Sequence, residues 1–208
     1  MRYQANIKLT LMLLAVGIAV YAGPATTNIP LALGFCKNPP IGPKFITNEF
    51  FNKQWYPWKG LGNMIFKRPG GCSGIDAKIE GSTIKVMTFH YEPLFSGYVT
   101  IEGEADNRIP RHQGLWFTID YHIMGLFHLP VPYTVLATDY SNWAVVYSCH
   151  QLLGFKIERT WILARTLSPN FTSETLSAIR SALETIDIDL EDLRFEDNSG
   201  CGQGEPRL

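Results

Sequence analysis

The sequence predicts an all-β fold: an eight-stranded antiparallel up-and-down barrel with one C-terminal α-helix packed on its outside. Short runs rich in β-branched and aromatic residues recur at fairly regular intervals, separated by turn residues, as in a β-barrel or sandwich. A single stretch with helical periodicity follows the last of these runs. Eight antiparallel strands can close into a barrel that holds one small ligand and leaves no exposed edge.

The strand signals define the wall of this barrel. The clearest hairpin joins two apolar runs, at 134–138 and 143–149, across a short polar break at 139–142. The expected strands are 55–66, 73–80, 83–91, 97–105, 114–121, 133–138, 143–150 and 157–165.

The expected helix spans about 172–187. Thr172 or Ser173 caps its start, and Glu174 lies in the first turn, where the helix dipole favours a negative charge. Apolar residues form one stripe at helical spacing: Leu176, Ile179, Leu183 and Ile186. A helix with a single apolar stripe packs on a surface, so we expect it against the outer barrel wall. A short strand is expected at 193–196.

The first 22 residues have the features of a secretory signal peptide. Arg2 and Lys8 bracket the start, an apolar run follows at 9–20, and Ala22 ends a cleavage site of small or compact residues. The apolar run is too short to span a bilayer. We therefore expect cleavage after Ala22 and a soluble, secreted, extracellular protein.

The remaining residues, 23–208, are expected to form a single domain. Its parts are a strap at 23–47, the barrel at about 53–166, the helix at about 172–187 and a tail at 197–208. The sequence is 46% hydrophobic and 18% charged, which is typical of a globular chain. After cleavage it keeps 16 of its 18 basic residues against 19 acidic ones and has no basic block, which argues against nucleic acid as a partner.

Four cysteines lie at positions 36, 72, 149 and 201. An even number in a secreted chain indicates two disulfides, and four cysteines allow three pairings. Their wide spacing, with no Cys-x-x-Cys pair and no neighbouring His pair, disfavours a zinc site, so we expect no metal and no cofactor. Asn170 begins the one glycosylation sequon, in what should be an exposed loop.

Three motifs occur in order along the chain. The segment 48–56 leads into the first expected strand and contains Trp55. The hairpin combines a Thr138-Asp139-Tyr140 turn with a Tyr147-x-Cys149 ending, and the last strand carries Trp161-Ile162-Leu163-Ala164-Arg165. Together they resemble the lipocalin family, and most closely its apolipoprotein D and insect bilin-binding branch. The family normally has Gly two residues before the Trp, where this chain has Lys53, a difference that concerns the local turn.

The resemblance implies structural roles and a disulfide pairing. In the family, the Trp of the first strand lies across the closed base of the barrel and the Arg of the last strand packs on it. Trp55 and Arg165 should therefore make a cation–π contact worth ~1–2 kcal/mol. The apolipoprotein D pattern implies the bonds Cys36–Cys149, which would pin the strap, and Cys72–Cys201, which would pin the tail.

Seven residues are candidates for a ligand pocket inside the barrel. Inward positions alternate along each strand, and some candidates match ligand contacts of apolipoprotein D-like proteins. The candidates are Val86, Thr88, His90, Phe117, Ile119, Tyr133 and Trp161. For any one of them ordinary core packing is the alternative. For the set we expect a pocket, because a barrel of this family is not filled by side chains.

Four loops at one end of the expected barrel are apolar, and this end admits the ligand in the family. A clustered apolar rim suggests contact with a lipid particle, a membrane or a protein. The candidate contact residues are Leu94, Phe95, Leu126, Phe127, Leu153 and Phe155. The alternative is that these loops fold over the mouth and bury one another.

The leading hypothesis is a secreted carrier of a small hydrophobic ligand: a fatty acid, a retinoid, a sterol-like compound or a bilin, as the resemblance implies. The second is an interaction module that uses the apolar rim. The third is a lipocalin-type enzyme or a protease modulator. We do not expect an enzyme, because the sequence has no nucleophile elbow, His-Glu-x-x-His, phosphate loop or dinucleotide fingerprint, and its cysteines are expected in disulfides.

Overall fold

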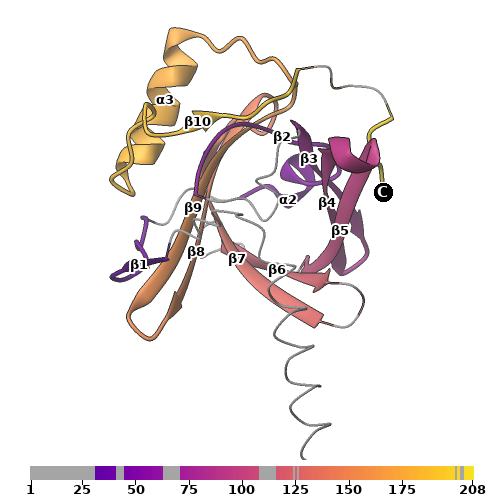
Figure 1. Cartoon of the computed structure of the whole chain (residues 1–208). Helices are drawn as coiled ribbons and strands as arrows, with labels where there is room; N and C mark the ends of the chain where they lie inside the picture. The colour runs from indigo at the N-terminus through magenta and orange to yellow at the C-terminus, as the bar shows by residue number, and fades with distance from the viewer. Residues whose placement is uncertain are drawn as a thin grey trace, which may run out of the picture.

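The computed structural model describes residues 31–40, 45–62, 71–107, 116–123, 125, 127–199, 201 and 204–208, so the expected signal peptide lies outside the described residues. An antiparallel sheet curls into a half-barrel, and helix α3 (Ser173–Glu184) lies on its outer side (Figure 1). This confirms the predicted fold class. None of the described helices is long and apolar enough to cross a membrane.

Eight strands form the wall of the half-barrel. They are β2 (Tyr56–Leu61), β3 (Gly71–Glu80), β4 (Thr83–Glu92), β5 (Gly97–Asp106), β6 (Trp116–Ile123), β7 (Phe127–Thr138), β8 (Trp143–Leu152) and β9 (Phe155–Ala164). Sheet neighbours follow chain order from β3 to β9, and β2 then pairs with β9. Two short strands extend this wall: β1 (Leu31–Leu33) pairs with β9, and β10 (Arg194–Phe195) pairs with β2.

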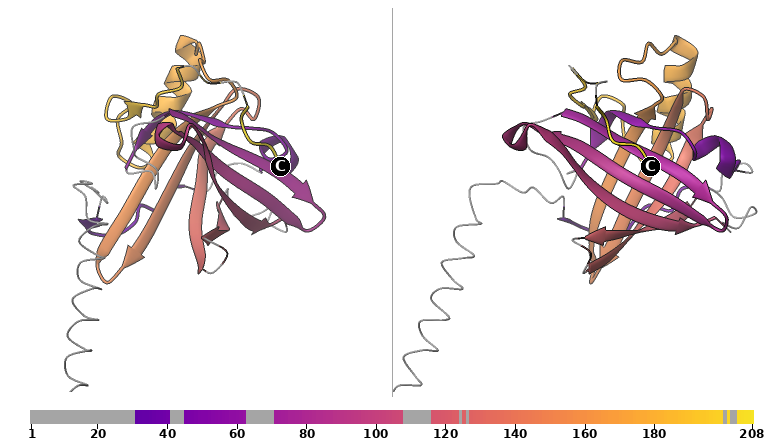
Figure 2. Two further views of the ribbon diagram at one scale, coloured as in Figure 1. Left: turned by 45° about the vertical axis from the view of Figure 1, so that its right-hand side comes forward. Right: turned by 90° about the vertical axis from the view of Figure 1, so that its right-hand side faces the viewer.

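The two ends of the wall meet at one point. Trp55 and Ile75 form an isolated bridge, in which each backbone N–H donates to the other residue's carbonyl at 2.8 Å. This bridge joins the chain just before β2 to the middle of β3. The two further views in Figure 2 show how strongly the sheet twists to bring these strands together.

Strand β7 begins six residues earlier than the expected 133–138. The added part contains Pro130 and Pro132, which donate no backbone N–H and are unfavourable inside a sheet. In the structure, β7 pairs with β6 along its length, but with β8 only from Thr134 onward. The prolines therefore lie where β7 pairs with β6 but not with β8. The expected apolar loop at 123–129 is correspondingly shorter, since residues from Phe127 belong to the strand.

Helix α3 packs where the sequence predicts. The hydroxyl of its N-cap, Thr172, accepts the N–H of Thr175. Ile179 and Leu183 are fully buried in an apolar cluster with outward-facing residues of β8 and β9. The helix ends at Glu184, earlier than expected, although Ile186 beyond it is fully buried as well. The sheet thus has an apolar core on its outer side in addition to the one inside the half-barrel.

Arg165 and Trp55 close the base of the half-barrel. The guanidinium carbon of Arg165 lies 3.3 Å from the centroid of the Trp55 ring. The guanidinium also donates five hydrogen bonds of 3.0–3.1 Å to the backbone carbonyls of four residues: Glu49, Phe50, Gln54 and Tyr140. Burial lowers the pKa of Arg165 to about 10, against the opposing effect of Asp139.

The carbonyls that Arg165 binds belong to three separate segments. Two come from the short helix α2 (Thr47–Phe50), whose last carbonyls have no partner within the helix. The others come from the residue before Trp55 and from the turn between β7 and β8. The Arg165 side chain therefore connects the end of β9 to all three of these segments at the base.

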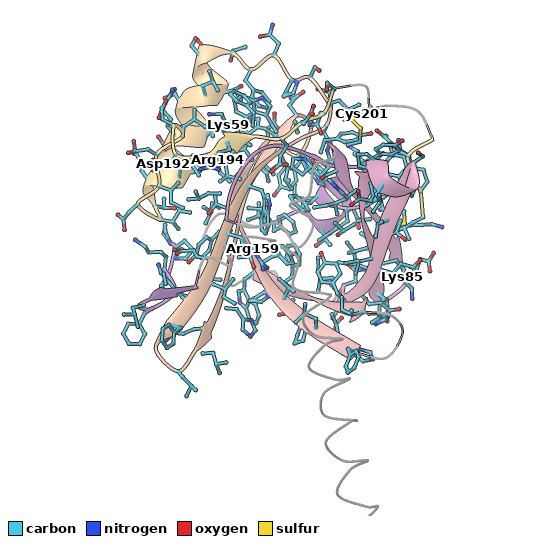
Figure 3. The ribbon with its side chains drawn as sticks, viewed as in Figure 1. Lys59, Lys85, Arg159, Asp192, Arg194 and Cys201 are labelled. Atoms are coloured by element: carbon cyan, nitrogen blue, oxygen red, sulfur yellow. A yellow bond between two sulfur atoms is a disulfide. The ribbon has the colours of Figure 1, made fainter. Side chains whose placement is uncertain are left out.

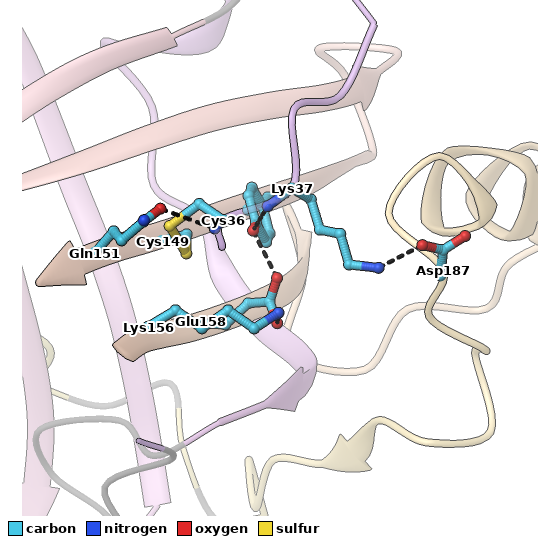
Figure 4. A network of polar contacts seen from close by, with 8 residues as sticks. Cys36, Lys37, Cys149, Gln151, Lys156, Glu158 and Asp187 are labelled. Atoms are coloured by element: carbon cyan, nitrogen blue, oxygen red, sulfur yellow. Dashed lines mark hydrogen bonds and ion pairs between the residues drawn. A yellow bond between two sulfur atoms is a disulfide. The ribbon is translucent and has the colours of Figure 1, made fainter. Parts of the chain in front are cut away.

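Two disulfides anchor the terminal segments to the half-barrel. Cys36–Cys149 ties the chain after β1 to β8, and Cys72–Cys201 ties the C-terminal tail to β3, as the family resemblance implies. Polar contacts surround the first bond: Cys36 donates its N–H to Gln151, and Lys37 pairs with Asp187 beyond α3 (Figure 4). All four cysteines are bonded.

Replacing Arg165 should destabilise the fold strongly. We expect Arg165→Met to lower the free energy of unfolding by about 2–4 kcal/mol, because it removes the guanidinium donor from four backbone carbonyls, of which that of Phe50 keeps the Trp55 indole N–H at 3.0 Å. The free energy of unfolding of Arg165→Lys should lie between those of the wild type and Arg165→Met, since an ammonium keeps the charge but not the planar fork. Denaturant unfolding of the disulfide-bonded protein measures both.

Arg180→Met is the matched control. Arg180 forms an exposed ion pair with Glu191 at 3.0 Å, and such pairs are worth about 0–1 kcal/mol. A loss for Arg165→Met no larger than that of the control would show that the base does not depend on Arg165.

Candidate functional site

A cavity lies inside the half-barrel and encloses about 1020 Å³ of empty volume, counting the part open to solvent. Most of its wall is aromatic or aliphatic, contributed by the inner faces of the strands and by α2. Five polar side chains also line it: Ser73, Thr88, Tyr121, Tyr133 and Arg159. The composition is that of a site for a small, mainly apolar molecule.

The structure brings six of the seven predicted pocket residues together. All six line the cavity: Val86, Thr88, Phe117, Ile119, Tyr133 and Trp161. They come from β4, β6, β7 and β9, and the register explains their convergence, since Phe117 pairs with Tyr133 and Ile119 with Val131 across β6 and β7. Side chains of directly opposed residues point to the same face of a sheet.

His90 is the exception, because it does not line the cavity. Its Nδ1 lies 2.9 Å from the hydroxyl oxygen of Ser73, and Ser73 itself lines the cavity. The pairing of β3 with β4 is irregular between Gly71 and Gly74, which places Ser73 across from His90. Burial lowers the pKa of His90, and the Glu92 carboxylate acts in the opposite direction. His90 is thus a buried structural partner of Ser73.

A chain of aromatic rings forms the floor and one wall of the cavity. Phe51 contacts Phe117 edge to face at 5.3 Å, Phe117 stacks on Tyr133 at 5.7 Å, and Tyr133 lies 6.0 Å from Trp161. Phe50 continues the floor toward the base. Such ring pairs add stability beyond their buried area, which favours this arrangement of the wall.

Three hydroxyl groups form a polar line in the cavity wall. The hydroxyl oxygens of Thr88 and Tyr121 lie 3.3 Å apart, and those of Tyr121 and Tyr133 lie 3.1 Å apart. Burial raises the pKa of Tyr121, and it raises that of Tyr133 well above the ordinary value, with Tyr121 adding to the effect. Both phenols are therefore protonated at physiological pH and can each donate one hydrogen bond.

Sequence reasoning missed two polar lining residues, Tyr121 and Arg159. Both were within reach of the alternation rule: Tyr121 shares its face with Phe117 and Ile119, and Arg159 shares its face with Trp161. Figure 3 shows Arg159 on β9, directed into the space that the sheet encloses. It is the charged residue of the cavity wall among the residues that the structure describes.

The rim at the mouth is exposed where the structure describes it. Leu153 is 89% exposed, Leu94 is 76% exposed and Phe127 is 67% exposed, while Phe155 is 40% exposed. Leu126 lies outside the described residues. Phe95 belongs to the short helix η1 (Pro93–Phe95), and its side chain is not among those described. The described rim residues are therefore not buried by one another.

Within the described part of the chain, one group of side chains could hold a metal ion: Asp120, His122 and His128. Nδ1 of His128 lies 2.9 Å from a carboxylate oxygen of Asp120, and the two imidazole rings meet edge to face at 4.8 Å. None of the three lines the cavity. They form a polar cluster on the outer face of β6 and β7, apart from the candidate ligand site.

A sequence model of the Triabin family matches residues 26–174 of this chain. Apolipoprotein D of Macaca fascicularis is 31% identical over 173 residues, which cover 81% of this chain and 85% of that protein. These matches span well over half of the sequence and agree in family.

Two solved structures share the fold at low identity. Insecticyanin from the tobacco hornworm Manduca sexta has a TM-score of 0.66 at 20% identity and covers 80% of this chain and 88% of its own. The amine binding protein of Rhodnius prolixus, solved as a tryptamine complex, has a TM-score of 0.62 at 17% identity. The match covers 77% of this chain and 85% of that chain. With the barrel, the external helix and the Trp55–Arg165 base, the chain belongs to the Triabin family of lipocalins, in the apolipoprotein D-like branch.

Proposed function

We propose that this protein is a secreted carrier that binds one small hydrophobic ligand inside the half-barrel. The observation that carries the proposal is the cavity, which combines an aromatic wall with a few converging polar groups. Burial of apolar ligand surface there contributes about 25 cal/mol per Å². The polar groups then orient the ligand. A fatty acid, a retinoid, a sterol-like compound and a bilin are the candidate ligands.

The comparisons support a small-molecule ligand in general terms. The amine binding protein of Rhodnius prolixus was solved with tryptamine, and this chain shares its fold. A carrier is favoured over an enzyme because all four cysteines are bonded, so the cavity offers no thiol nucleophile.

Secretion and glycosylation belong to the same proposal. Two disulfides suit an oxidising extracellular compartment. Asn170 is exposed, two residues before the N-cap Thr172, and is therefore accessible to glycosylation.

Ligand titration tests the carrier function. We expect saturable quenching of tryptophan fluorescence by at least one of retinol, a long-chain fatty acid, a sterol and biliverdin. Trp161 lines the cavity, so Trp161→Phe should remove most of the quenching. Equilibrium dialysis with the same ligand confirms that binding itself persists in this variant.

A cavity-filling variant supplies the stricter control. Ile101 lines the cavity, so Ile101→Trp should weaken binding at least tenfold in equilibrium dialysis. The residue directly before it, Thr100, is exposed on the outer face, and Thr100→Trp adds the same ring to the same strand without touching the cavity. Absence of saturable binding to all four ligands, or equal binding by Ile101→Trp and wild type, would contradict the proposal.

The exposed rim supports a second function, docking of the open end on a lipid surface. Apolar residues continue beyond the β8–β9 turn, because Leu33 of β1 lies opposite Phe155 in the sheet register and is itself exposed. Clustered apolar residues of this kind bind lipid interfaces or partners. Docking would let a hydrophobic ligand pass between a membrane and the cavity without crossing water.

Removing two rim residues should weaken lipid association. We expect the double variant Phe127→Ser and Leu153→Ser to bind phosphatidylcholine liposomes several-fold more weakly in a flotation assay, with an unchanged unfolding midpoint. Trp116→Ser is the control. Trp116 is also exposed, but it begins β6 at the end of that strand away from the mouth. Liposome binding that is absent in wild type, or equal in wild type and the double variant, would exclude docking.

A further inference from the structure

Arg159 places a permanent positive charge in a cavity whose wall is otherwise apolar or hydroxylic. A guanidinium is always protonated in proteins and presents five N–H donors in a planar fork that matches a carboxylate. The charge acts across the cavity, since it lowers the pKa of both Tyr121 and Tyr133 against the larger effect of burial. Cation and hydroxyls therefore face a common space.

The polar groups occupy a particular depth in the half-barrel. Along β9, Arg159 lies nearer the mouth than Trp161, and Trp161 lies nearer the mouth than Leu163, which is buried at the base. Along β6, Tyr121 likewise lies nearer the mouth than Phe117. The cavity is thus apolar at its floor and polar toward its opening.

A structural role alone gives a poorer account of this side chain. A cation that merely covers apolar surface usually extends its charged end into water outside the protein. Arg159 instead points inward, as Figure 3 shows, while Lys156 and Glu158 pair at 2.6 Å on the outer face of the same strand. An Arg beside phenol and hydroxyl donors has the chemistry of an anion site, because every one of these groups can donate a hydrogen bond.

We infer that the cavity selects amphipathic anions. The carboxylate of the ligand lies against Arg159, its apolar body lies against the aromatic floor, and the linked hydroxyls of Thr88, Tyr121 and Tyr133 supply the one O–H that their two mutual hydrogen bonds leave free. The inference rests on the carrier function proposed above and narrows its ligand class. A neutral molecule of the same shape would lack the negative charge that matches the guanidinium. Long-chain carboxylic acids and other apolar carboxylates are therefore preferred over alcohols, esters and sterols.

A matched pair of ligands tests the inference. Parinaric acid and its methyl ester share one fluorescent chain and differ in charge, and their own emission rises in an apolar site. We expect wild-type protein at neutral pH and low salt to bind the acid at least tenfold more tightly than the ester. Arg159→Gln should weaken binding of the acid about tenfold to a hundredfold and change binding of the ester less than about twofold.

Two further variants separate charge from packing. Arg159→Lys keeps the charge without the bidentate fork and should retain part of the preference for the acid. Lys156→Gln removes a cation from the outer face of the same strand and should leave both affinities unchanged.

Each outcome decides a different point. Equal loss of acid and ester binding in Arg159→Gln would assign Arg159 to packing and overturn the inference. Equal binding of acid and ester by wild type would overturn it as well, yet leave the carrier function standing. Failure of wild type to bind either probe saturably would instead contradict the carrier function itself.

Discussion

The stacking of Arg165 on Trp55 is the contact on which the rest of the half-barrel depends. An Arg can be half-buried at the base because five hydrogen bonds to carbonyls replace part of its water. Those carbonyls lie in α2, before β2 and in the β7–β8 turn, so one side chain fixes three segments that are distant in sequence. The exposed apolar rim lies at the opposite end of the half-barrel.

Much of this arrangement follows from local sequence rules. Alternation along a strand and the order of three motifs are sufficient to place Trp161, Phe117 and Ile119 on the inner wall, because antiparallel pairing carries the same face across neighbouring strands. His90 does not line the cavity, and the irregularity in β3 places Ser73, which does, across from it. A bulge changes which residues face inward. The sequence of β4 alone gives no sign of an irregularity in the neighbouring strand β3.

Other features depended on tertiary context. Two prolines end a strand by local rules, yet β7 continues through Pro130 and Pro132 where it has β6 as its partner. Strand β1 has no periodic pattern and exists because β9 offers it an edge, next to the Cys36–Cys149 bond. Arg159 and Tyr121 were accessible to the alternation rule but carry no motif, so a resemblance to known ligand contacts did not single them out.

Arg159 on β9 and Arg165, directly after the end of β9, have different roles because they lie at different depths in the half-barrel. At the base, Arg165 is surrounded by backbone carbonyls, which are acceptors, so its donors are satisfied by the fold itself. Toward the mouth, Arg159 lines the cavity together with hydroxyl groups, and the carboxylate of a ligand is an acceptor that suits this set. A gradient from apolar floor to cationic wall then fixes the direction of binding: the apolar end of the ligand enters first and its charged end remains nearest the opening.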